Sequence, residues 1–362
     1  MQPIDSQWMA RALQLAALGL NTTSPNPRVG CVLVKEGKII GEGWHQRAGE
    51  AHAEVHALRA AGSAAQGATA YVTLEPCSHF GRTPPCAGAL IAAGISRVVI
   101  AMQDPNPLVS GQGIALLRDA GIEVEYGLIE SVARELNIGF FARMTRGLPW
   151  VRSKIAASLD GRTALANGTS QWITGEAARQ DVQRWRARSC AVVTGIGTVL
   201  ADDPQLNVRI DTGRQPLRVV LDSDLRIPPN AKIIQQGTLI FTASTHAHNI
   251  AALQARGVQV VFLPGADKRI DLQAVMRDLA QRGINEVLLE AGRTLNGAML
   301  KAGLVDELVV YLAPQFLGDA ARGMANLGEL TQLEQRMNLV WQDVRQVGND
   351  LRITARINGH HQ

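Results

Sequence analysis

The sequence predicts an α/β protein of two domains. Patterns typical of helices and of buried strands alternate along the chain, as in mostly parallel sheets covered by helices on both faces. The alternation restarts after a short segment, residues 143–149, that contains the helix breakers Gly147 and Pro149. A length of 362 residues also suits two domains. We therefore expect one domain over residues 1–145 and a second over 146–362.

The first half opens with a helical pattern over residues 6–20, because its apolar residues recur on one face. A buried strand follows over 29–34, and Glu36-Gly37 turns it into a strand over 38–44, which predicts a hairpin. The remaining elements follow from short apolar runs and from glycines that end helices. They are a helix (51–61), a strand (70–74), a helix (87–93), a strand (97–102), a helix (114–120) and a strand (122–126).

The second half repeats this alternation. The predicted elements are a strand (150–157), a helix (175–188), strands (190–194, 217–221, 238–242 and 258–263), a helix (271–282), a strand (286–290), a helix (295–302) and strands (306–312 and 351–357).

The composition excludes several protein classes. With 46% hydrophobic and 19% charged residues, the chain is neither disordered nor collagen-like, and four cysteines do not make a disulfide framework. The 36 basic residues face 32 acidic ones without a basic block, so we expect no nucleic acid partner. No apolar run reaches the ~18 residues of a membrane span. Residues 4–20 contain Asp5 and Arg11, which favours an amphipathic helix over a signal peptide. We expect a cytoplasmic protein without a membrane partner.

A histidine, a glutamate and two cysteines in the first half match the residues of a hydrolytic zinc site. His52 begins a predicted helix, Glu54 follows two residues later, and Cys77 and Cys86 come after the next strand. These three ligands leave a fourth position for water, whose pKa zinc lowers to about 7. Glu54 is placed to take a proton from this water and return it to a leaving amine, as in zinc deaminases. We expect one Zn²⁺ per chain.

A purely structural zinc site is the alternative. It needs a fourth protein ligand, which His56 or His79 would supply. The remaining cysteines, Cys31 and Cys190, lie in apolar runs and are expected to be core residues.

Two turns in the second half are compatible with a dinucleotide. Residues 195–200 read Gly-x-Gly-x-x-Leu after a strand, so the last glycine of the Rossmann fingerprint is missing. Around Gly292 a glycine turn leads from a strand into a helix N-terminus, which suits a phosphate. Taken alone, either turn is more typical of an ordinary strand-to-helix connection than of a dinucleotide site.

Three segments of the first half closely resemble the deaminase domain of the bifunctional RibD family of riboflavin biosynthesis. They are SPNPRVG (24–30), HAE (52–54) and TLEPCSHFGRTPPC (73–86), in which eight residues separate the cysteines. The resemblance implies a cytidine-deaminase-like three-layer fold, zinc bound by His52, Cys77 and Cys86, and Glu54 as the proton shuttle. It also implies that Asn26 contacts the substrate, and it leaves the roles of His45 and His79 open.

Three segments of the second half resemble the reductase domain of the same family over almost all of residues 148–357. They are KIAASLDG (154–161), SQWIT (170–174) and VLADDPQLNVR (199–209). The resemblance implies a dihydrofolate-reductase-like fold that uses NADPH. The implied cofactor contacts are Ala156, Trp172, Thr198, Asp202, Ser223, Gly292, Arg293, Thr294, Leu295, Asn296, Gly297 and Ala298. The implied substrate contacts are Ser170, Arg186, Leu206, Arg209 and Glu290, to which strand residue Lys154 is added as a candidate.

The charges suit a substrate that carries a ribose phosphate, because Arg186 and Arg209 offer fork-shaped donors. Ser223 and Arg226 follow a strand end where an adenosine 2′-phosphate fits. The resemblance implies zinc-dependent deamination of a phosphoribosylaminopyrimidine, then NADPH-dependent reduction of its ribosyl group, in a homodimer. Two alternatives are a nucleic-acid deaminase with an unrelated tail and a non-catalytic, zinc-stabilised binding protein with four ligands.

Overall fold

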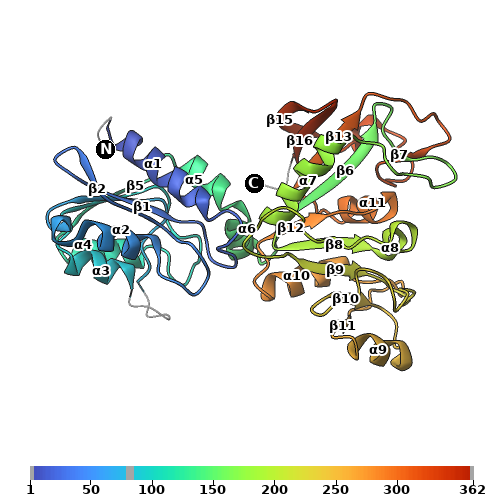
Figure 1. Cartoon of the computed structure of the whole chain (residues 1–362), viewed down its shortest axis with the longest axis horizontal. Helices are drawn as coiled ribbons and strands as arrows, with labels where there is room; N and C mark the ends of the chain where they lie inside the picture. Colours follow the sequence, from blue (N-terminus) through green and yellow to red (C-terminus); the bar gives the residue numbers. More distant parts are fainter. Residues whose placement is uncertain (1–3, 79–84, 359–362) are drawn as a thin grey trace. The chain divides into compact units, whose positions relative to one another are not determined.

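The structure, a computed structural model, describes residues 4–78 and 85–358 and divides into two compact units, Met1–Leu148 and Pro149–Gln362 (Figure 1). Residue 145, where we expected the boundary, lies in the last turn of helix α6 (Ile138–Arg146). Among the residues that the structure describes, no helix combines the length and the apolar character needed to cross a bilayer.

Unit 1 contains a five-stranded sheet in the order β2-β1-β3-β4-β5. Its strands are β1 (Gly30–Lys35), β2 (Lys38–Trp44), β3 (Thr69–Val72), β4 (Arg97–Ile100) and β5 (Glu123–Tyr126). The predicted hairpin is confirmed, because β1 and β2 pair antiparallel. β1 also pairs antiparallel with β3, whereas β3, β4 and β5 are parallel, so this sheet is less parallel than the alternation predicted.

Helices cover both faces of this sheet (Figure 1). They are α1 (Asp5–Leu18), α2 (Ala53–Ala61), the 3₁₀ turn η1 (Gly62–Ala65), α3 (Cys86–Ala92), α4 (Gln112–Asp119), α5 (Glu130–Leu136) and α6. α1 and α5 lie on one face, and α2, α3 and α4 lie on the other (Figure 1). The result is a three-layer arrangement, and Cys31 is fully buried in its core as predicted.

Two glycines let helices approach the hairpin closely. A Cβ atom on Gly30 would lie 2.0 Å from the carbonyl oxygen of Ala12 in α1. A Cβ atom on Gly43 would lie 2.4 Å from the carbonyl oxygen of Ala53 in α2. Because Gly43 pairs with Cys31, the neighbour of Gly30, the two glycines face opposite sides of the sheet. Each helix therefore packs on the strand backbone itself.

Unit 2 contains a nine-stranded sheet in the order β11-β10-β9-β8-β12-β6-β13-β16-β15. Its strands are β6 (Trp150–Ser158), β8 (Ala191–Gly195), β9 (Leu217–Leu221), β10 (Leu239–Thr242), β11 (Gln259–Phe262), β12 (Glu286–Leu289), β13 (Glu307–Ala313), β15 (Leu339–Val347) and β16 (Asp350–Ile357). The pairs from β11 to β13 are parallel, and β16 and β15 add an antiparallel edge. A small sheet joins β7 (Arg162–Ala164) and β14 (Arg322–Gly323).

The helices of unit 2 connect these strands. They are α7 (Glu176–Arg188), α8 (Ile196–Asp202), α9 (Ala247–Gln254), α10 (Leu272–Gln281), α11 (Arg293–Lys301) and the 3₁₀ turn η2 (Leu333–Gln335). The Gly-x-Gly-x-x-Leu segment is not an extended glycine turn, because Gly195 is the N-cap residue and α8 begins at Ile196. The second predicted turn is also short. Gly292 is the N-cap residue of α11, and residues 293–298 already lie within this helix.

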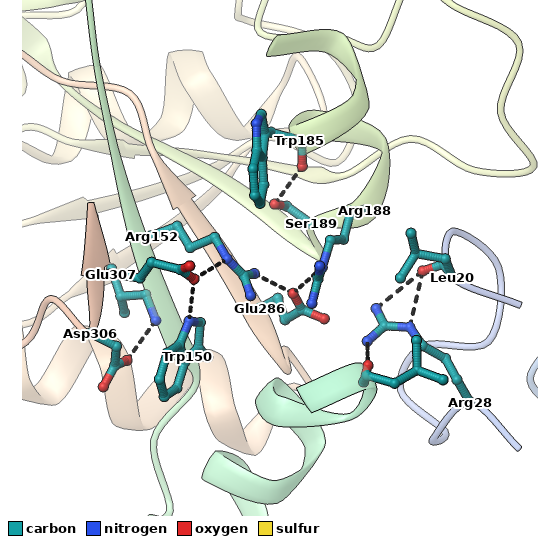
Figure 2. A network of polar contacts seen from close by, with 12 residues as sticks. Leu20, Arg28, Trp150, Arg152, Trp185, Arg188, Ser189, Glu286, Asp306 and Glu307 are labelled. Carbon is teal, nitrogen blue, oxygen red and sulfur yellow. Dashed lines mark hydrogen bonds and ion pairs between the residues drawn. The ribbon is translucent and has the colours of Figure 1, made fainter. Parts of the chain in front are cut away.

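A buried ion network crosses the strands of unit 2 (Figure 2). Arg152 of β6 is 1% exposed and lies between Glu286 and Glu307, with its Nε donating to Glu307 at 2.6 Å. Arg188 also donates to Glu286 at 2.8 Å. Burial alone would raise the pKa of Glu307, but the charge of Arg152 lowers it below its ordinary value. A buried charge of this kind is tolerated only because it is paired and hydrogen-bonded.

Candidate active sites

The three predicted zinc ligands meet in unit 1. His52 is the N-cap residue of α2, Cys77 lies in the loop after β3, and Cys86 is the first residue of α3. Nδ1 of His52 lies 3.6 Å from Sγ of Cys77 and 3.3 Å from Sγ of Cys86. All three ligand atoms lie within 4.8 Å of one another.

The chemistry of this cluster fits zinc. It offers one imidazole nitrogen and two sulfurs, the donor set of a zinc site with an open position. Over residues 4–78 and 85–358, no fourth histidine, cysteine or carboxylate joins the group, and His56 is therefore not part of it. His79, the other candidate for a fourth ligand, lies outside the described residues. Hydrogen bonds with Cys86 and His52 lower the pKa of the Cys77 thiol to about 4, which favours the thiolate that binds metal.

Glu54 lies beside the cluster in the first turn of α2. It is only 3% exposed, and its Oε2 is buried without a hydrogen-bond partner in the described part of the chain. Burial, together with the nearby Cys77 thiolate, raises the pKa of the Glu54 carboxyl to about 7. A carboxyl with this pKa exchanges protons readily at neutral pH. The orphaned oxygen also indicates a polar group that a bound molecule satisfies.

A chain of hydrogen bonds fixes the amide of Asn26. His45 is buried, and its Nδ1 lies 3.1 Å from the carbonyl oxygen of Ala51, which can only accept. Nε2 of the neutral ring is therefore an acceptor, and Nδ2 of Asn26 donates to it at 3.0 Å. Burial lowers the pKa of His45, which favours this neutral ring. The carbonyl oxygen of Asn26 is left to accept from a bound molecule.

Sequence reasoning missed a second acidic residue near the metal cluster. Glu75, two residues before Cys77, is 5% exposed and accepts four backbone N–H groups. The available signal was a charged residue between an apolar strand and Pro76.

In unit 2, four of the predicted substrate residues form one charged group. Arg186 of α7 donates to Glu290 through Nε at 2.5 Å and Nη2 at 2.9 Å. Burial lowers the pKa of the Lys154 amine, and the charge of Arg186 adds to this effect while Glu290 opposes it. Arg209 is exposed, and its charge also acts on Glu290. In this structure Glu290 occupies the guanidinium fork of Arg186, so the expected contact of Arg186 with the substrate phosphate stays a prediction.

Other predicted contacts lie near one another at the exposed surface. Ser170 and Gln171 both lie within 3.5 Å of Oδ1 of Asp202. Trp172 is 68% exposed, and the guanidinium of Arg179 lies 4.7 Å from the centre of its ring. Leu206 differs from these residues because its side chain is buried in the core.

The two turns that were predicted to bind phosphate lie at neighbouring helix N-termini. A Cβ atom on Gly292, which precedes α11, would lie 3.9 Å from Oγ1 of Thr198 in the first turn of α8. Both helices follow parallel strands, β8 and β12, at the carboxyl edge of the sheet, where such folds bind nucleotides. Ala156 and Lys154, two residues apart, lie on one face of β6.

Several residues of the 292–298 segment have structural partners. Nδ2 of Asn296 donates to the carbonyls of Ala291 and Met324, and its Oδ1 faces Ser153. A Cβ atom on Gly297 would lie 2.2 Å from the carbonyl oxygen of Asn326. Arg293, Thr294, Leu295 and Ala298 lie in the first two turns of α11. At the end of β9, Oγ of Ser223 accepts from the N–H of Ile270 at 3.3 Å.

Known proteins resemble this chain over both units. Residues 2–102 match the cytidine and deoxycytidylate deaminase zinc-binding region, and residues 149–353 match the RibD C-terminal domain. The riboflavin biosynthesis protein RibD of Escherichia coli (strain K12) is 52% identical over 96% of this chain and 98% of its own length. The protein of the same name from Haemophilus influenzae is 48% identical over 98% of both chains.

Solved structures agree with this similarity. A structure of Acinetobacter baumannii RibD superposes with a TM-score of 0.91 at 48% identity and covers 98% of this chain and 99% of that one. A deaminase/reductase from Thermotoga maritima superposes with a TM-score of 0.87 at 33% identity, with the same coverage. The first half therefore has a cytidine-deaminase-like fold and the second a dihydrofolate-reductase-like fold. The chain belongs to the RibD family of riboflavin biosynthesis proteins, which join a deaminase and a reductase.

Proposed function

We propose that this chain catalyses two consecutive reactions on one small-molecule substrate. The first replaces the C2 amino group of 2,5-diamino-6-(5-phosphoribosylamino)pyrimidin-4(3H)-one by oxygen, with water entering and ammonia leaving. The second reduces the ribosyl group of the resulting 5-amino-6-(5-phosphoribosylamino)uracil to ribityl, with NADPH as the hydride donor. The observation that carries the proposal is the buried Glu54 carboxyl beside the His52, Cys77 and Cys86 cluster.

For the deamination, His52, Cys77 and Cys86 would hold zinc, and Glu54 is placed to move the protons. When bound, zinc lowers the pKa of water. Glu54, with its unpartnered Oε2, is placed to accept a proton from the attacking water and to deliver it to the leaving amine. A pKa of about 7 suits both steps, because the carboxyl then gains and loses a proton at similar free energy.

Asn26 orients the pyrimidine nucleotide in this site. Because His45 holds its Nδ2, the carbonyl oxygen of Asn26 is directed to accept from an N–H or O–H group of the substrate. His45 therefore acts through Asn26.

In the reduction, charged residues of unit 2 hold the substrate. Arg209 is the exposed fork donor for the ribose phosphate, and Lys154 with Glu290 offers a donor and an acceptor to the opening sugar. Ser170, Leu206 and Arg186 are assigned to the substrate by the family pattern. We expect the rate of hydride transfer to be raised mainly by placing the reacting carbon next to the nicotinamide.

NADPH supplies the hydride, and the carboxyl edge of the sheet would hold it. The N-termini of α8 and α11, with Thr198, Gly292 and the following residues, suit its diphosphate. Ser223 lies at the end of β9 for the adenosine 2′-phosphate, and Ala156, Trp172 and Asp202 complete the assigned contacts.

The two activities are assigned to residues 1–145 and 146–362, and the chain is expected to be a cytoplasmic homodimer without nucleic acid or membrane partners. Support for self-association comes from apolar side chains exposed on the edge strand β15, including Val340, Trp341 and Val344. Size-exclusion chromatography with light scattering tests this point.

The function is tested by incubating the purified protein with the diaminopyrimidine nucleotide, with and without NADPH, and analysing the products by mass spectrometry. Without NADPH we expect the amino-to-oxygen exchange alone, and with NADPH the further addition of a pair of hydrogens. A nucleic-acid deaminase would leave this nucleotide unchanged and would act on cytosine or adenine in a strand. A zinc-stabilised binding protein would convert neither the nucleotide nor the strand.

A further inference from the structure

The carboxylate of Glu75 accepts four backbone N–H groups from one neighbouring part of the chain. Its Oε1 accepts from Gly113 at 2.9 Å and from Ile114 at 3.2 Å. Its Oε2 accepts from Gly111 at 3.0 Å and from Asp104 at 3.1 Å. A carboxylate has about four acceptor positions, so this side chain is saturated by main-chain donors.

These donors make Glu75 a cap for α4 supplied by another segment. Gly113 and Ile114 lie in the first turn of α4, where N–H groups have no partner within the helix. A negative charge at this position is stabilised by the helix dipole and by charge-assisted hydrogen bonds. Because Asp104 and Gly111 bond to the other oxygen, the same carboxylate also fixes both ends of the loop 104–111.

The contact is close because Gly113 has no side chain. A Cβ atom there would lie 2.0 Å from the carbonyl oxygen of Pro76 and 3.2 Å from Oε1 of Glu75. The start of α4 thus packs directly on the backbone that joins Glu75 to the metal ligand Cys77.

Topology places this loop next to the segment that leads to the metal ligand Cys77. β3 and β4 are parallel, so the segments that follow them, Glu75–Cys77 and the loop 104–111, leave the same edge of the sheet. Within the loop, Asp104 accepts from the N–H of Asn106 and Asn106 accepts from the N–H of Leu108. The loop is therefore held internally by its own side chains, and Glu75 sets its position relative to Cys77.

We propose that Glu75 is a positioning residue for deamination, which holds the loop 104–111 as a wall of the pyrimidine site. This proposal rests on the proposed deaminase function. Glu75 is not part of the cluster of metal ligands, and main-chain N–H groups occupy its acceptor positions, so it acts through the loop and α4. Its loss is expected to weaken substrate binding while leaving zinc binding and the chemistry of unit 2 intact.

The test is Glu75→Gln in the full-length protein. Whichever way the amide is turned, two of the four N–H groups face an NH₂ group and lose their acceptor. We expect KM for the diaminopyrimidine nucleotide to rise at least about tenfold, with kcat lowered less than about threefold, because binding geometry is lost and the reacting groups remain. Zinc content and the rate of ribosyl reduction, measured on the deaminated substrate, should equal those of the wild type.

Glu42→Gln is the matched control. Glu42 lies on β2 of the same unit and accepts two hydrogen bonds from Arg11, at 2.7 and 2.9 Å, so the change also removes a paired carboxylate. It is expected to leave KM within about twofold of the wild type, since distant sites act independently.

Gly113→Ala provides a second route to the same displacement, because its methyl group pushes α4 from Pro76 while Glu75 stays charged. Gly113→Ala should also raise KM for the diaminopyrimidine nucleotide. If Glu75→Gln loses zinc or unfolds, the KM of Gly113→Ala becomes the test of the proposal. An unchanged KM in a folded, zinc-loaded Glu75→Gln protein, or in Gly113→Ala when that variant decides, would overturn the proposal. A wild-type protein that does not deaminate this nucleotide would instead contradict the proposed function.

Discussion

Arg186 and Glu290 form a two-pronged ion pair, with Nε to Oε1 at 2.5 Å and Nη2 to Oε2 at 2.9 Å. Both side chains are nearly buried, at 12% and 11% exposure. The third nitrogen of the guanidinium donates to the carbonyl of Asn207, so the pair also holds the chain next to Arg209. This ion pair links helix α7, the end of β12 and the loop that carries the substrate residues.

Glu290→Gln should destabilise unit 2. It leaves the guanidinium of Arg186 buried with neutral acceptors only, and breaking a buried pair costs about 3–5 kcal/mol. We expect a lower thermal transition for unit 2 in calorimetry, together with impaired reduction. Glu329→Gln, at an exposed position, should change stability by less than about 0.5 kcal/mol. Equal transition temperatures for both variants would show that the pair contributes nothing to folding.

The same pair predicts how stability depends on pH. Burial alone would raise the pKa of Glu290, but the charges of Arg186 and Lys154 lower it below its ordinary value. The stabilisation is therefore complete above the unfolded-state pKa of about 4.3 and is lost as pH falls through the lower, folded-state value. Glu290→Gln should lack this part of the acid transition. Melting curves between pH 7 and pH 3 test this, and identical profiles for both proteins would contradict the assignment.

Zinc should be present at about one ion per chain and should depend on both cysteines. The Cys77→Ala, Cys86→Ala double variant removes two of the three ligands in the cluster, so elemental analysis should find no zinc. Cys190→Ala, which changes a core cysteine of unit 2, should retain it. Full zinc retention in the double variant would place the metal elsewhere.

Glu54→Gln should abolish deamination without releasing zinc. The amide cannot move a proton, and general acid–base catalysis contributes about 10²–10⁴ in rate. Reduction of the already deaminated substrate should stay within about threefold of the wild type, because the two sites share no partners. Arg209→Ala should do the reverse, since it removes a donor for the sugar phosphate. If Glu54→Gln abolished both activities in a folded protein, the two activities would have to be assigned to one shared site.

The reductase should prefer NADPH over NADH. A charge-assisted contact to the additional phosphate is worth about 1.5–3 kcal/mol, which corresponds to at least about tenfold in kcat/KM. Ser223→Asp places a negative charge at the end of β9 and should reduce that ratio. Equal kcat/KM values for the two cofactors would refute the preference, and an unchanged ratio in Ser223→Asp would move the phosphate site elsewhere.

Elements with a strong apolar period could be predicted from the sequence. The helix over residues 175–188 and the strand over 190–194 are confirmed as α7 and β8. β15 was not predicted, because most of its side chains are exposed and show no alternation. α6 was not predicted because its end, with Gly147 and Pro149 after it, was interpreted as a domain boundary.

The metal cluster could be predicted because its residue types are themselves the signal. Contacts between distant segments could not be predicted from the sequence, because no local pattern encodes them. Arg186 and Glu290 are 104 residues apart, and the amides bound by Glu75 follow it by 29 to 39 residues. A sequence read one segment at a time assigns Arg186 to a phosphate, whereas the folded chain gives it an internal partner.

Gly43 extends the region of the chain on which deamination depends. It faces α2 from the hairpin, and a methyl group there would meet the backbone of Ala53, the residue between His52 and Glu54. Any larger side chain would tilt the start of α2 and carry both the imidazole and the carboxyl away from the thiolates. A random mutagenesis screen for variants that still reduce but no longer deaminate should therefore recover substitutions at Gly43. The mutational footprint of the active site thus includes a position defined by a missing side chain.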